Sequence, residues 1–358
     1  MTIQVFIVDD SMVSRLMLRK LVELEDQFTV VGEASDGQEA IDKIPRQEVD
    51  IVLMDLMMPV MDGLDATRWL MQNNPTPILL VSDLVGRDAE LNFRAVDAGA
   101  LDVVRKPSAE DMDDPRVVSR FHRMIRVLSD VPLITRRRKP VDTPHVPDAV
   151  GLDEETSAGD TGVGPVSLVV IGASTGGPTA LASLLQGLDG PPDWPLVIVQ
   201  HITRDFAPGM TKWLQNISGL DIHLVRERTP LKSGSVYVAP DSADLVLNSG
   251  RLDLINDDEA LRRRSYPSID VTLKSITNSP IASEALAILL TGMGSDGASA
   301  LKSVRERGGW TVAQDRESSA VWGIPRVADE LGAARQVLSL DAIGELLNSV
   351  PGTGRFDS

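Results

Sequence analysis

The sequence contains no cysteine. Disulfide bonds, cysteine nucleophiles and thiolate metal sites are therefore excluded, and any covalent catalysis must use other side chains. No apolar run approaches the roughly 20 residues that a membrane-spanning helix needs. The first ten residues lack a basic segment and already include Asp9 and Asp10, which is not the pattern of a signal peptide. We therefore expect a cytoplasmic protein without membrane insertion.

Positive charge is scarce as well. The chain has 35 Lys and Arg against 52 Asp and Glu, which gives a formal net charge of −17. Such a charge disfavours broad contact with nucleic acid or anionic membranes, so we expect no nucleic-acid partner. The 358 residues are enough for two domains, and 42% apolar and 24% charged residues are ordinary for a globular protein.

Short apolar runs alternate with helical patterns over residues 1–127. Five such units, with nearly continuous apolar strands, predict a doubly wound parallel sheet with helices on both faces. Its ligand site is expected beyond the carboxyl ends of the strands. Strands are predicted at 5–8, 29–32, 51–54, 78–81 and 102–104, and helices at 12–25, 37–44, 64–72, 88–98 and 113–127.

Acidic residues lie at these predicted strand ends. Asp9 and Asp10 follow the first strand and Asp55 follows the third. Three carboxylates at one edge would repel one another unless a cation lies among them, and Mg²⁺ prefers oxygen ligands of this kind. Lys106 follows the fifth strand, where it could bind a phosphoryl group accepted by an Asp nucleophile. Taken singly, Asp9 or Asp10 could be a helix cap and Lys106 a solvated loop lysine.

These residues lie in segments that resemble the receiver domain of two-component response regulators. The resemblance rests on Val8-Asp9-Asp10-Ser11, Leu53 to Gly63, Ser82 and Lys106-Pro107. It implies a flavodoxin-like fold for residues 1–127, with Asp55 as the phosphoacceptor.

The same resemblance assigns the neighbouring residues. It implies that Asp10, Asp55 and the backbone carbonyl of Met57 bind Mg²⁺, with Asp9 assisting through water. Ser82 and Lys106 would bind phosphoryl oxygens. The position three residues before Lys106 is often aromatic in receivers and is Val103 here. The usual rotamer switch of a large ring is therefore not expected in this chain.

Residues 128–165 have the composition of a flexible linker. A basic run from Arg136 to Lys139 is followed by three prolines, and an acidic, glycine-rich run extends from Asp153 to Gly164. Low hydrophobicity combined with proline and glycine predicts an extended connector. The basic run could bind an acidic partner, although such a run is more commonly a solvated charge cluster.

The second half of the chain is organised around Gly172-Ala-Ser174-Thr-Gly176. An apolar run precedes this segment and a helical pattern follows it, so the period changes from strand to helix at the serine. A Gly-x-Ser-x-Gly turn in this context exposes a nucleophilic serine above a sheet. The same pattern could instead be a glycine turn that binds a phosphate, with Ser174 capping the helix.

The other apolar runs predict an α/β domain with a mostly parallel sheet over residues 166–350. Residues 244–256 predict an antiparallel hairpin inserted into it. Further strands are predicted at 195–201, 222–225, 235–239, 285–290 and 311–315, and helices at 178–186 and from about 268 and 298.

Ser174, His201 and Asp296 each follow the end of a predicted strand. Such ends share one edge of a parallel sheet, so the three could act as nucleophile, base and orienting acid. Asp296 could instead cap the next helix. The loop that contains Met293 offers backbone N–H groups for an oxyanion. The other histidines are placed differently: His122 in a predicted helix, His145 in the linker and His223 inside a strand.

The order Ser, His, Asp is not that of α/β-hydrolases. Residues 166–350 resemble instead the catalytic domain of the chemotaxis protein-glutamate methylesterases, the CheB family. The resemblance rests on Gly172 to Pro178, Val199-Gln-His201, Tyr266 to Asp270, Leu290 to Gly297 and Ala313-Gln314. It implies Ser174 as nucleophile, His201 as general base, Asp296 as its partner and the Met293 N–H as an oxyanion donor. The chain departs from the family pattern in residues 202–206, which lack the expected prolines, and at Ile324, where methionine is expected.

The resemblance implies a phosphorylation-controlled esterase that demethylates glutamates of chemoreceptor cytoplasmic domains and releases methanol, with glutamine deamidation as a second reaction. Its phosphodonor would be a histidine kinase of the chemotaxis type, and no cofactor is expected in the esterase site. We expect the unphosphorylated receiver to cover the serine. Two alternatives remain: a phosphorylation-switched module that binds a nucleotide at its glycine loops, and a hydrolase that acts outside chemotaxis.

Overall fold

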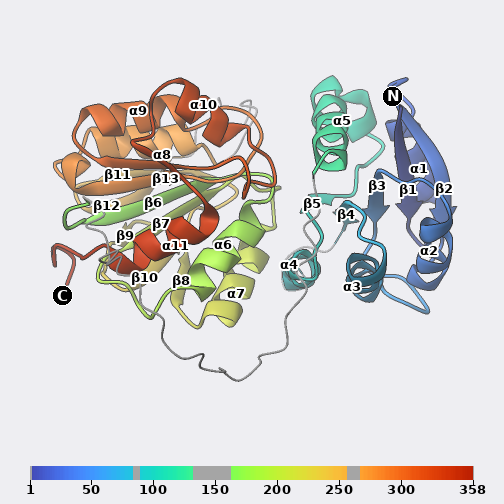
Figure 1. Cartoon of the computed structure of the whole chain (residues 1–358), viewed down its shortest axis with the longest axis horizontal. Helices are drawn as coiled ribbons and strands as arrows, with labels where there is room; N and C mark the ends of the chain where they lie inside the picture. The colour runs from blue at the N-terminus through green and yellow to red at the C-terminus, as the bar shows by residue number, and fades with distance from the viewer. Residues whose placement is uncertain (1, 84–88, 132–162, 256–266, 358) are drawn as a thin grey trace, which may run out of the picture.

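The computed structural model describes residues 2–83, 89–131, 163–255 and 267–357. These residues form two α/β units, each with a parallel sheet between layers of helices (Figure 1). The segments 136–139 and 153–162, His145 and Tyr266 lie outside the described residues.

The first domain is a five-stranded parallel sheet in the order β2-β1-β3-β4-β5. This order confirms the doubly wound fold predicted from the sequence, and every residue of β3 and β4 is buried. The strands are β1 Ile3–Val8, β2 Phe28–Ala34, β3 Ile51–Met54, β4 Ile78–Ser82 and β5 Asp102–Arg105. The helices are α1 Met12–Val22, α2 Gly37–Lys43, η1 Ile44–Arg46, α3 Gly63–Asn73, α4 Ala89–Asp97, η3 Asp111–Asp113 and α5 Pro115–Ser129.

The second domain is a seven-stranded parallel sheet in the order β15-β14-β13-β6-β7-β10-β8, joined by a three-stranded antiparallel sheet, β11-β12-β9. This arrangement confirms the predicted α/β domain with an antiparallel insertion. The strands are β6 Leu168–Ala173, β7 Leu196–Gln200, β8 Asp221–Leu224, β9 Thr229–Pro230, β10 Ser235–Val238, β11 Asp244–Asn248, β12 Arg251–Ile255, β13 Ala285–Leu289, β14 Trp310–Gln314 and β15 Gln336–Leu338. The helices are α6 Gly177–Gln186, α7 Ala207–Ser218, α8 Ile269–Thr277, η5 Ala282–Glu284, α9 Ala298–Glu306, α10 Ile324–Glu330 and α11 Leu340–Ser349.

Helix α7 is the largest element that the sequence patterns did not predict. Pro208 and Gly209 lie in its first turn and resemble a loop signal, but proline is tolerated there because those N–H groups have no intrahelical partner. Helices α10 and α11 and strand β15 were also not predicted. Helix α1 ends at Val22 rather than at residue 25, because Glu23 already occupies its C-cap.

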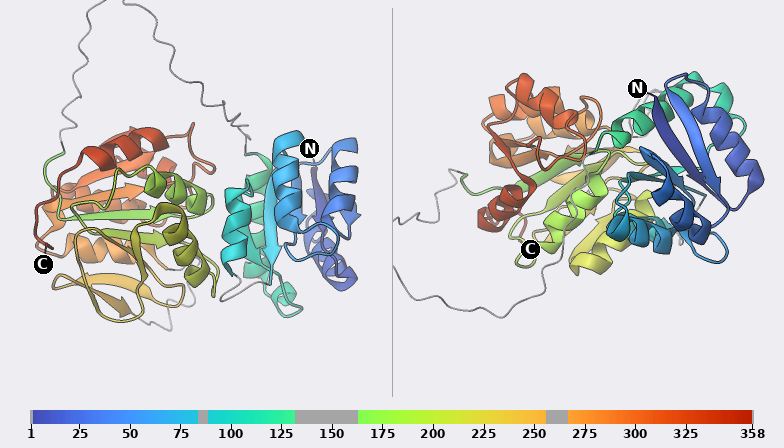
Figure 2. Two further views of the ribbon diagram at one scale, coloured as in Figure 1. Left: turned by 90° about the horizontal axis from the view of Figure 1, so that it is seen from below. Right: turned by 45° about the vertical axis from the view of Figure 1, so that its right-hand side comes forward.

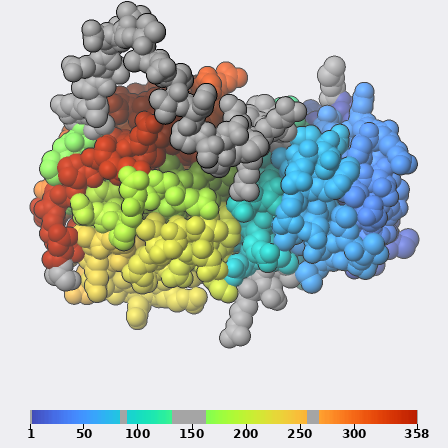
Figure 3. Space-filling model, turned by 60° about the horizontal axis from the view of Figure 1, so that its bottom comes forward, coloured from blue at the N-terminus to red at the C-terminus, as the bar shows by residue number. Residues whose placement is uncertain are grey.

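Helix α4 of the first domain packs against helix α7 of the second. The rings of Phe93 and Trp213 stack with centroids 5.5 Å apart, and both side chains are buried. Glu90 forms an ion pair of 2.8 Å with Lys212 and accepts a hydrogen bond of 2.8 Å from Asn216. The two domains lie side by side in Figure 2 and their atoms meet in the space-filling view of Figure 3, and α5 also faces the second domain in Figure 1.

A second apolar contact lies on the α5 side. Val321 belongs to the same buried cluster as Met124 and Phe121 of the first domain, and Met293 packs against that cluster. The two domains are therefore in contact on both sides of the space between them. Among the helices that the structure describes, none is both long enough and apolar enough to cross a bilayer.

Candidate active site

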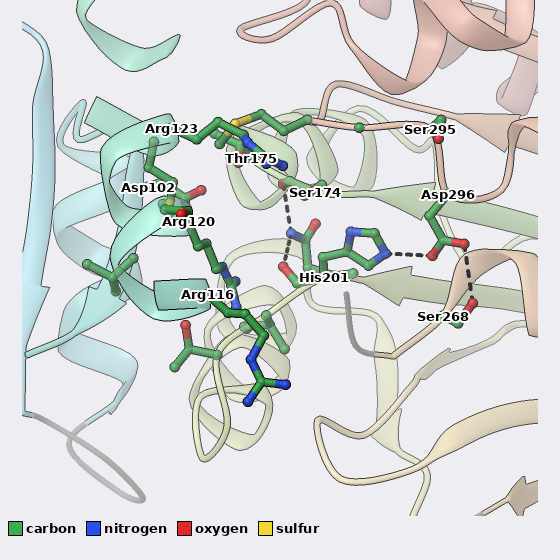
Figure 4. A pocket seen from close by; sticks show the side chains of 18 of the residues that line it. Asp102, Arg116, Arg120, Arg123, Ser174, Thr175, His201, Ser268, Ser295 and Asp296 are labelled. Carbon is green, nitrogen blue, oxygen red and sulfur yellow. Dashed lines mark hydrogen bonds and ion pairs between the residues drawn. The ribbon is translucent and has the colours of Figure 1, made fainter. Parts of the chain in front are cut away.

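The carboxyl edge of the seven-stranded sheet carries three of the predicted site residues. Ser174 directly follows β6, His201 directly follows β7, and Asp296 lies in the loop between β13 and α9. All three line one cavity of about 1070 Å³ between the two domains, which we call the interdomain cavity (Figure 4). The structure thus brings together residues that are more than 120 positions apart at their extremes.

The turn that holds Ser174 is fixed by its backbone. Gly176 has a φ of 77°, in the left-handed region that favours glycine, and it precedes α6 as the N-cap. The Ser174 N–H donates to the Thr291 carbonyl at 3.0 Å, and the Ser174 carbonyl accepts from the Gln200 side chain at 2.8 Å. The same Gln200 amide donates to the His201 carbonyl at 2.8 Å, so one side chain positions both residues.

The imidazole of His201 is oriented by Asp296. Its Nε2 lies 2.8 Å from Asp296 Oδ2. That carboxylate also accepts from the backbone N–H groups of Ile269 and Asp270, at 2.8 and 3.1 Å, and from the Ser268 hydroxyl at 3.2 Å. Burial raises the pKa of Asp296, but the His201 contact and the two backbone hydrogen bonds outweigh it, and the net pKa is lowered.

These contacts place Asp296 at the start of α8. The alternative that it caps the following helix, α9, is not what the structure shows, because Gly297 is the N-cap of α9. The carboxylate instead accepts from the first turn of α8, where N–H groups lack intrahelical partners and the helix dipole favours a negative charge. An ionised acid is therefore held against the imidazole.

The Ser174 hydroxyl lies on the other side of the His201 ring. Figure 4 shows the ring between Ser174 and Asp296. In the part of the chain that the structure describes, no hydrogen bond joins the Ser174 hydroxyl to the imidazole. Because Nε2 faces Asp296, Nδ1 is the ring nitrogen left for the serine. Such contacts are often long in the absence of substrate.

The loop after β13 packs tightly beneath Ser174. A Cβ atom on Gly292 would lie 2.5 Å from the Ser174 Cβ, so only glycine fits there. The Thr291 hydroxyl donates to the Thr175 carbonyl at 2.9 Å, and the Thr291 N–H donates to the Gln314 side chain at 2.8 Å. Met293 follows directly and lines the interdomain cavity. The backbone of the predicted oxyanion loop is thus adjacent to the serine.

The first domain supplies the opposite wall of the interdomain cavity. Asp102 at the start of β5 lies against Thr175, and Arg116, Arg120 and Arg123 of α5 line the same space (Figure 4). Burial raises the pKa of Asp102 to about 6. Hydrogen bonds from the Val103 N–H and from Thr175, and the positive charge of Arg120, each lower this pKa but do not outweigh the burial.

An acidic pocket lies at the carboxyl edge of the five-stranded sheet. Oxygen atoms of Asp9, Asp10 and Asp55 lie within 4.8 Å of one another. Lys106 Nζ lies 2.8 Å from Asp9 and 2.9 Å from Asp55. Burial raises the pKa of Asp55, and its contacts with Lys106 oppose the rise. Three carboxylates facing one ammonium leave an excess of negative oxygen donors, which fits a hard divalent cation such as Mg²⁺.

The remaining predicted residues fall in two places. Ser82 ends β4 and is buried, and its carbonyl accepts from the Lys106 N–H at 3.1 Å, which places it next to the lysine of the acidic pocket. Met57 lies two residues after Asp55 and is exposed. His122 and His223 do not line the interdomain cavity: His122 is buried with its Nε2 2.6 Å from the Leu21 carbonyl, and His223 is exposed.

Several positioning residues were not assigned a role from the sequence. Gln200 and Gln314 are buried polar residues at the ends of otherwise apolar strands, and that anomaly was the available signal. Ser268 both caps α8 and donates to Asp296. The wall formed by the first domain carries no local signal, because it depends on how two separate domains meet.

The family described as CheB methylesterase matches residues 169–347, and the response regulator receiver domain matches residues 5–114. A protein-glutamate methylesterase/protein-glutamine glutaminase from Methanospirillum hungatei is 37% identical over 97% of this chain and 98% of its own length. One from Paramagnetospirillum magneticum is 38% identical over 98% of this chain and 96% of its own length. The solved CheB methylesterase catalytic domain of Thermotoga maritima is 32% identical, with 51% of this chain and 97% of that chain covered and a TM-score of 0.48.

Proposed function

The chain belongs to the CheB methylesterase family and carries a receiver domain, and on that basis we propose that it is a phosphorylation-regulated protein-glutamate methylesterase. Its substrates would be glutamate methyl esters on chemoreceptor cytoplasmic domains, and its products glutamate and methanol. Glutamine deamidation to glutamate would be its second reaction. The relatives give no support to a nucleotide-binding module or to a hydrolase outside chemotaxis.

The observation that carries the chemistry is the 2.8 Å contact between His201 and Asp296 beside Ser174. We assign Ser174 as nucleophile, His201 as general base and Asp296 as the acid that orients the ring. The Ser174 hydroxyl attacks the ester carbonyl while its proton passes to Nδ1 of His201. The ionised Asp296 stabilises the imidazolium that forms.

The remaining steps return the site to its starting state. Collapse of the tetrahedral intermediate breaks the bond to the methoxy oxygen, which takes the proton from His201 and leaves as methanol. Water then gives a proton to His201 while its oxygen attacks the acyl-enzyme carbonyl. Collapse of this second intermediate breaks the bond to Ser174 Oγ, which takes the proton back from His201, and the glutamate side chain is released. We assign the Met293 N–H to the oxyanion, since its loop packs directly under the serine.

The receiver would control this site through Asp55. We propose Asp55 as the phosphoacceptor, a histidine kinase of the chemotaxis type as its donor, and Ser82 and Lys106 as the residues that bind phosphoryl oxygens. Asp10, Asp55 and the Met57 carbonyl would hold Mg²⁺, with Asp9 assisting. The metal would neutralise phosphoryl charge, while Lys106 already bridges two of the carboxylates.

We further propose three parts of the chain: a receiver at 1–127, a linker at 128–165 and a catalytic domain at 166–350. Receiver residues of β5 and α5 line the same cavity as Ser174, which is only 8% exposed, and this supports a closed arrangement in which the receiver would cover the serine. Phosphorylation of Asp55 would loosen this cover and admit a receptor helix, whose diameter is roughly 10–12 Å. The protein would act in the cytoplasm, where the receptor domains lie.

The test is methanol release from a methylated receptor cytoplasmic domain, with and without a small-molecule phosphodonor and Mg²⁺. The proposal expects release that the phosphodonor increases and that Ser174→Ala abolishes. Release that persists in Ser174→Ala, or no release from the phosphorylated enzyme, would contradict it. Removal of residues 1–160 should raise activity above that of the intact unphosphorylated chain if the receiver acts as a cover.

A further inference from the structure

Three arginines of α5 face the catalytic edge from the receiver. Arg116, Arg120 and Arg123 have helical spacings of four and three residues, so they share one face of the helix, and all three are exposed to the interdomain cavity. Figure 4 shows their side chains extending from α5 toward the second domain, with Arg123 close to Thr175, the neighbour of Ser174. We call this set the arginine face.

The arginine face does not hold the two domains together. Arg116 forms an ion pair with Asp114 of its own helix cap at 3.1 Å. Neither Arg120 nor Arg123 forms an ion pair with any carboxylate that the structure describes, although Asp102 acts on Arg120 through its charge. The ion pair that does cross between the domains, Glu90 with Lys212, lies on α4 and α7.

The charge of the arginine face is unusual for this chain. With a formal net charge of −17, the protein as a whole repels acidic partners. Arg120 and Arg123 place two guanidinium groups, without an ion pair to any carboxylate that the structure describes, on the receiver wall of the interdomain cavity, while its acidic lining residues are Asp102, Asp114, Asp270 and Asp296. Guanidinium binds carboxylate through two parallel hydrogen bonds, a geometry that lysine does not reproduce. The ligand that fits this wall is therefore a carboxylate close to the scissile ester.

We propose that Arg120 and Arg123 bind free carboxylates that neighbour the methyl ester on the protein substrate. This inference rests on the proposed methylesterase function, because each demethylated glutamate of a receptor is itself such a carboxylate. On a helical substrate, glutamates three or four residues from the ester lie on the same face as the ester. Once phosphorylation has loosened the receiver, the ester would meet Ser174 while such a glutamate meets the arginine side chains that extend toward Thr175, the neighbour of Ser174. The receiver is then part of the substrate-binding surface as well as its cover.

A preference among substrates follows. A receptor in which some sites already carry free glutamate is a better substrate than one in which the neighbouring sites are neutral. Because the arginines contact the substrate away from the reacting atoms, they lower KM and leave kcat nearly unchanged. The preference should weaken as ionic strength increases, since the charges are exposed to solvent.

The test uses the full chain with a small-molecule phosphodonor and Mg²⁺. Two receptor cytoplasmic domains carry one methylated glutamate each, flanked one turn away by glutamate in the first and by alanine in the second. Methanol release gives kcat and KM for both substrates. The enzymes compared are the unmodified chain, Arg120→Gln/Arg123→Gln, and Arg46→Gln/Arg68→Gln, a control that removes the same charge from exposed receiver positions outside the cavity.

The proposal expects the unmodified enzyme and the control to have a KM about tenfold lower for the glutamate-flanked substrate. Arg120→Gln/Arg123→Gln should lose that difference while its kcat on the alanine-flanked substrate stays the same, which also shows that the variant is folded. Equal KM values in the unmodified enzyme, or a preference that survives in the variant, would overturn the proposal while leaving the methylesterase function intact. If the variant released methanol faster from both substrates, the arginines would act only in holding the receiver over Ser174, and the proposed role in substrate binding would be overturned. No methanol from either substrate would contradict the methylesterase function, and this inference with it.

Discussion

His201 Nε2 lies 2.8 Å from Asp296 Oδ2, and that carboxylate is fixed in turn by two backbone N–H groups at the start of α8. The acid is therefore held by the scaffold before any substrate arrives. The contact holds the imidazole in one orientation through Nε2 and leaves Nδ1 as the ring nitrogen available to the serine. That preorganisation is what a serine hydrolase needs, and it gives the first prediction.

We expect His201→Gln and Asp296→Asn each to lower kcat for methanol release by a factor of about 10³ or more. Asp296→Asn should also lower stability, because both carboxylate oxygens accept from N–H groups and an amide nitrogen cannot. The chain contains its own control. His223 forms a similar contact with Asp221, at 2.7 Å, but it is exposed and lies outside the interdomain cavity. His223→Gln should therefore leave kcat unchanged. Equal losses in His201→Gln and His223→Gln would show that the effect is not catalytic.

Two glycines make a matched pair. Gly292→Ala places a Cβ atom 2.5 Å from the Ser174 Cβ, so the serine and its loop must move. We expect at least a hundredfold loss of kcat and a destabilisation of about 1–3 kcal/mol. Gly344 lies inside α11, where its nearest neighbour would be 3.7 Å from a new Cβ. Gly344→Ala should instead stabilise the protein by about 0.5–1 kcal/mol. Thermal unfolding and methanol release measure both.

The pH dependence of the closed arrangement follows from Asp102. The pKa of its carboxyl is raised to about 6 where the receiver meets Thr175, so the closed arrangement favours the protonated acid. This contribution to closure is present below the ordinary pKa of 3.8 and is lost as pH rises through about 6. In Asp102→Asn the side chain at position 102 is uncharged at every pH, so this contribution to closure is not lost as the pH rises.

We therefore expect the unphosphorylated wild-type enzyme to release methanol faster than Asp102→Asn at about pH 7, and the ratio of the two rates to decrease toward about pH 5. Taking the ratio removes titration of the catalytic residues, which both enzymes share. A ratio that is constant over this range would show that ionisation of Asp102 does not oppose closure.

Metal removal should distinguish the role of the receiver from that of the esterase domain. Chelation of Mg²⁺ should abolish the increase in methanol release that the phosphodonor produces, because the three carboxylates of Asp9, Asp10 and Asp55 then lack their counter-charge. The basal rate should stay the same, since no metal is assigned to the esterase site. Asp55→Asn should behave in the same way with Mg²⁺ present. A basal rate that falls on chelation would contradict this division of roles.

The sequence allowed prediction of the sheet edge that carries the proposed catalytic residues, because its signals are local. Each strand is a short apolar run: Ser174 is the first polar residue after one, and His201 follows another that ends in Gln200. In a parallel sheet these positions share an edge, so their meeting could be foreseen without coordinates. Asp296 was foreseen in the same way, but its support by α8 was not, because that contact joins a loop side chain to the first turn of a helix that is distant in the sequence.

Other features could not be read from local patterns. Helix α7 was not predicted because the dipeptide Pro208-Gly209 is typical of a loop, although proline is compatible with the first turn of a helix. Arg120 and Arg123 look like ordinary solvated charges on an amphipathic helix. Their position opposite Ser174 depends on how the receiver meets the catalytic domain, and no periodicity within either domain encodes that arrangement.

The most direct test of the central claim is covalent labelling of Ser174 by a serine-reactive organophosphonate, located by mass spectrometry in the full chain with phosphodonor and Mg²⁺. The account predicts one adduct per chain on the peptide that contains Ser174, none in Ser174→Ala, and labelling at least about a hundredfold slower in His201→Gln. An adduct elsewhere, or equal labelling rates with and without the imidazole, would contradict it.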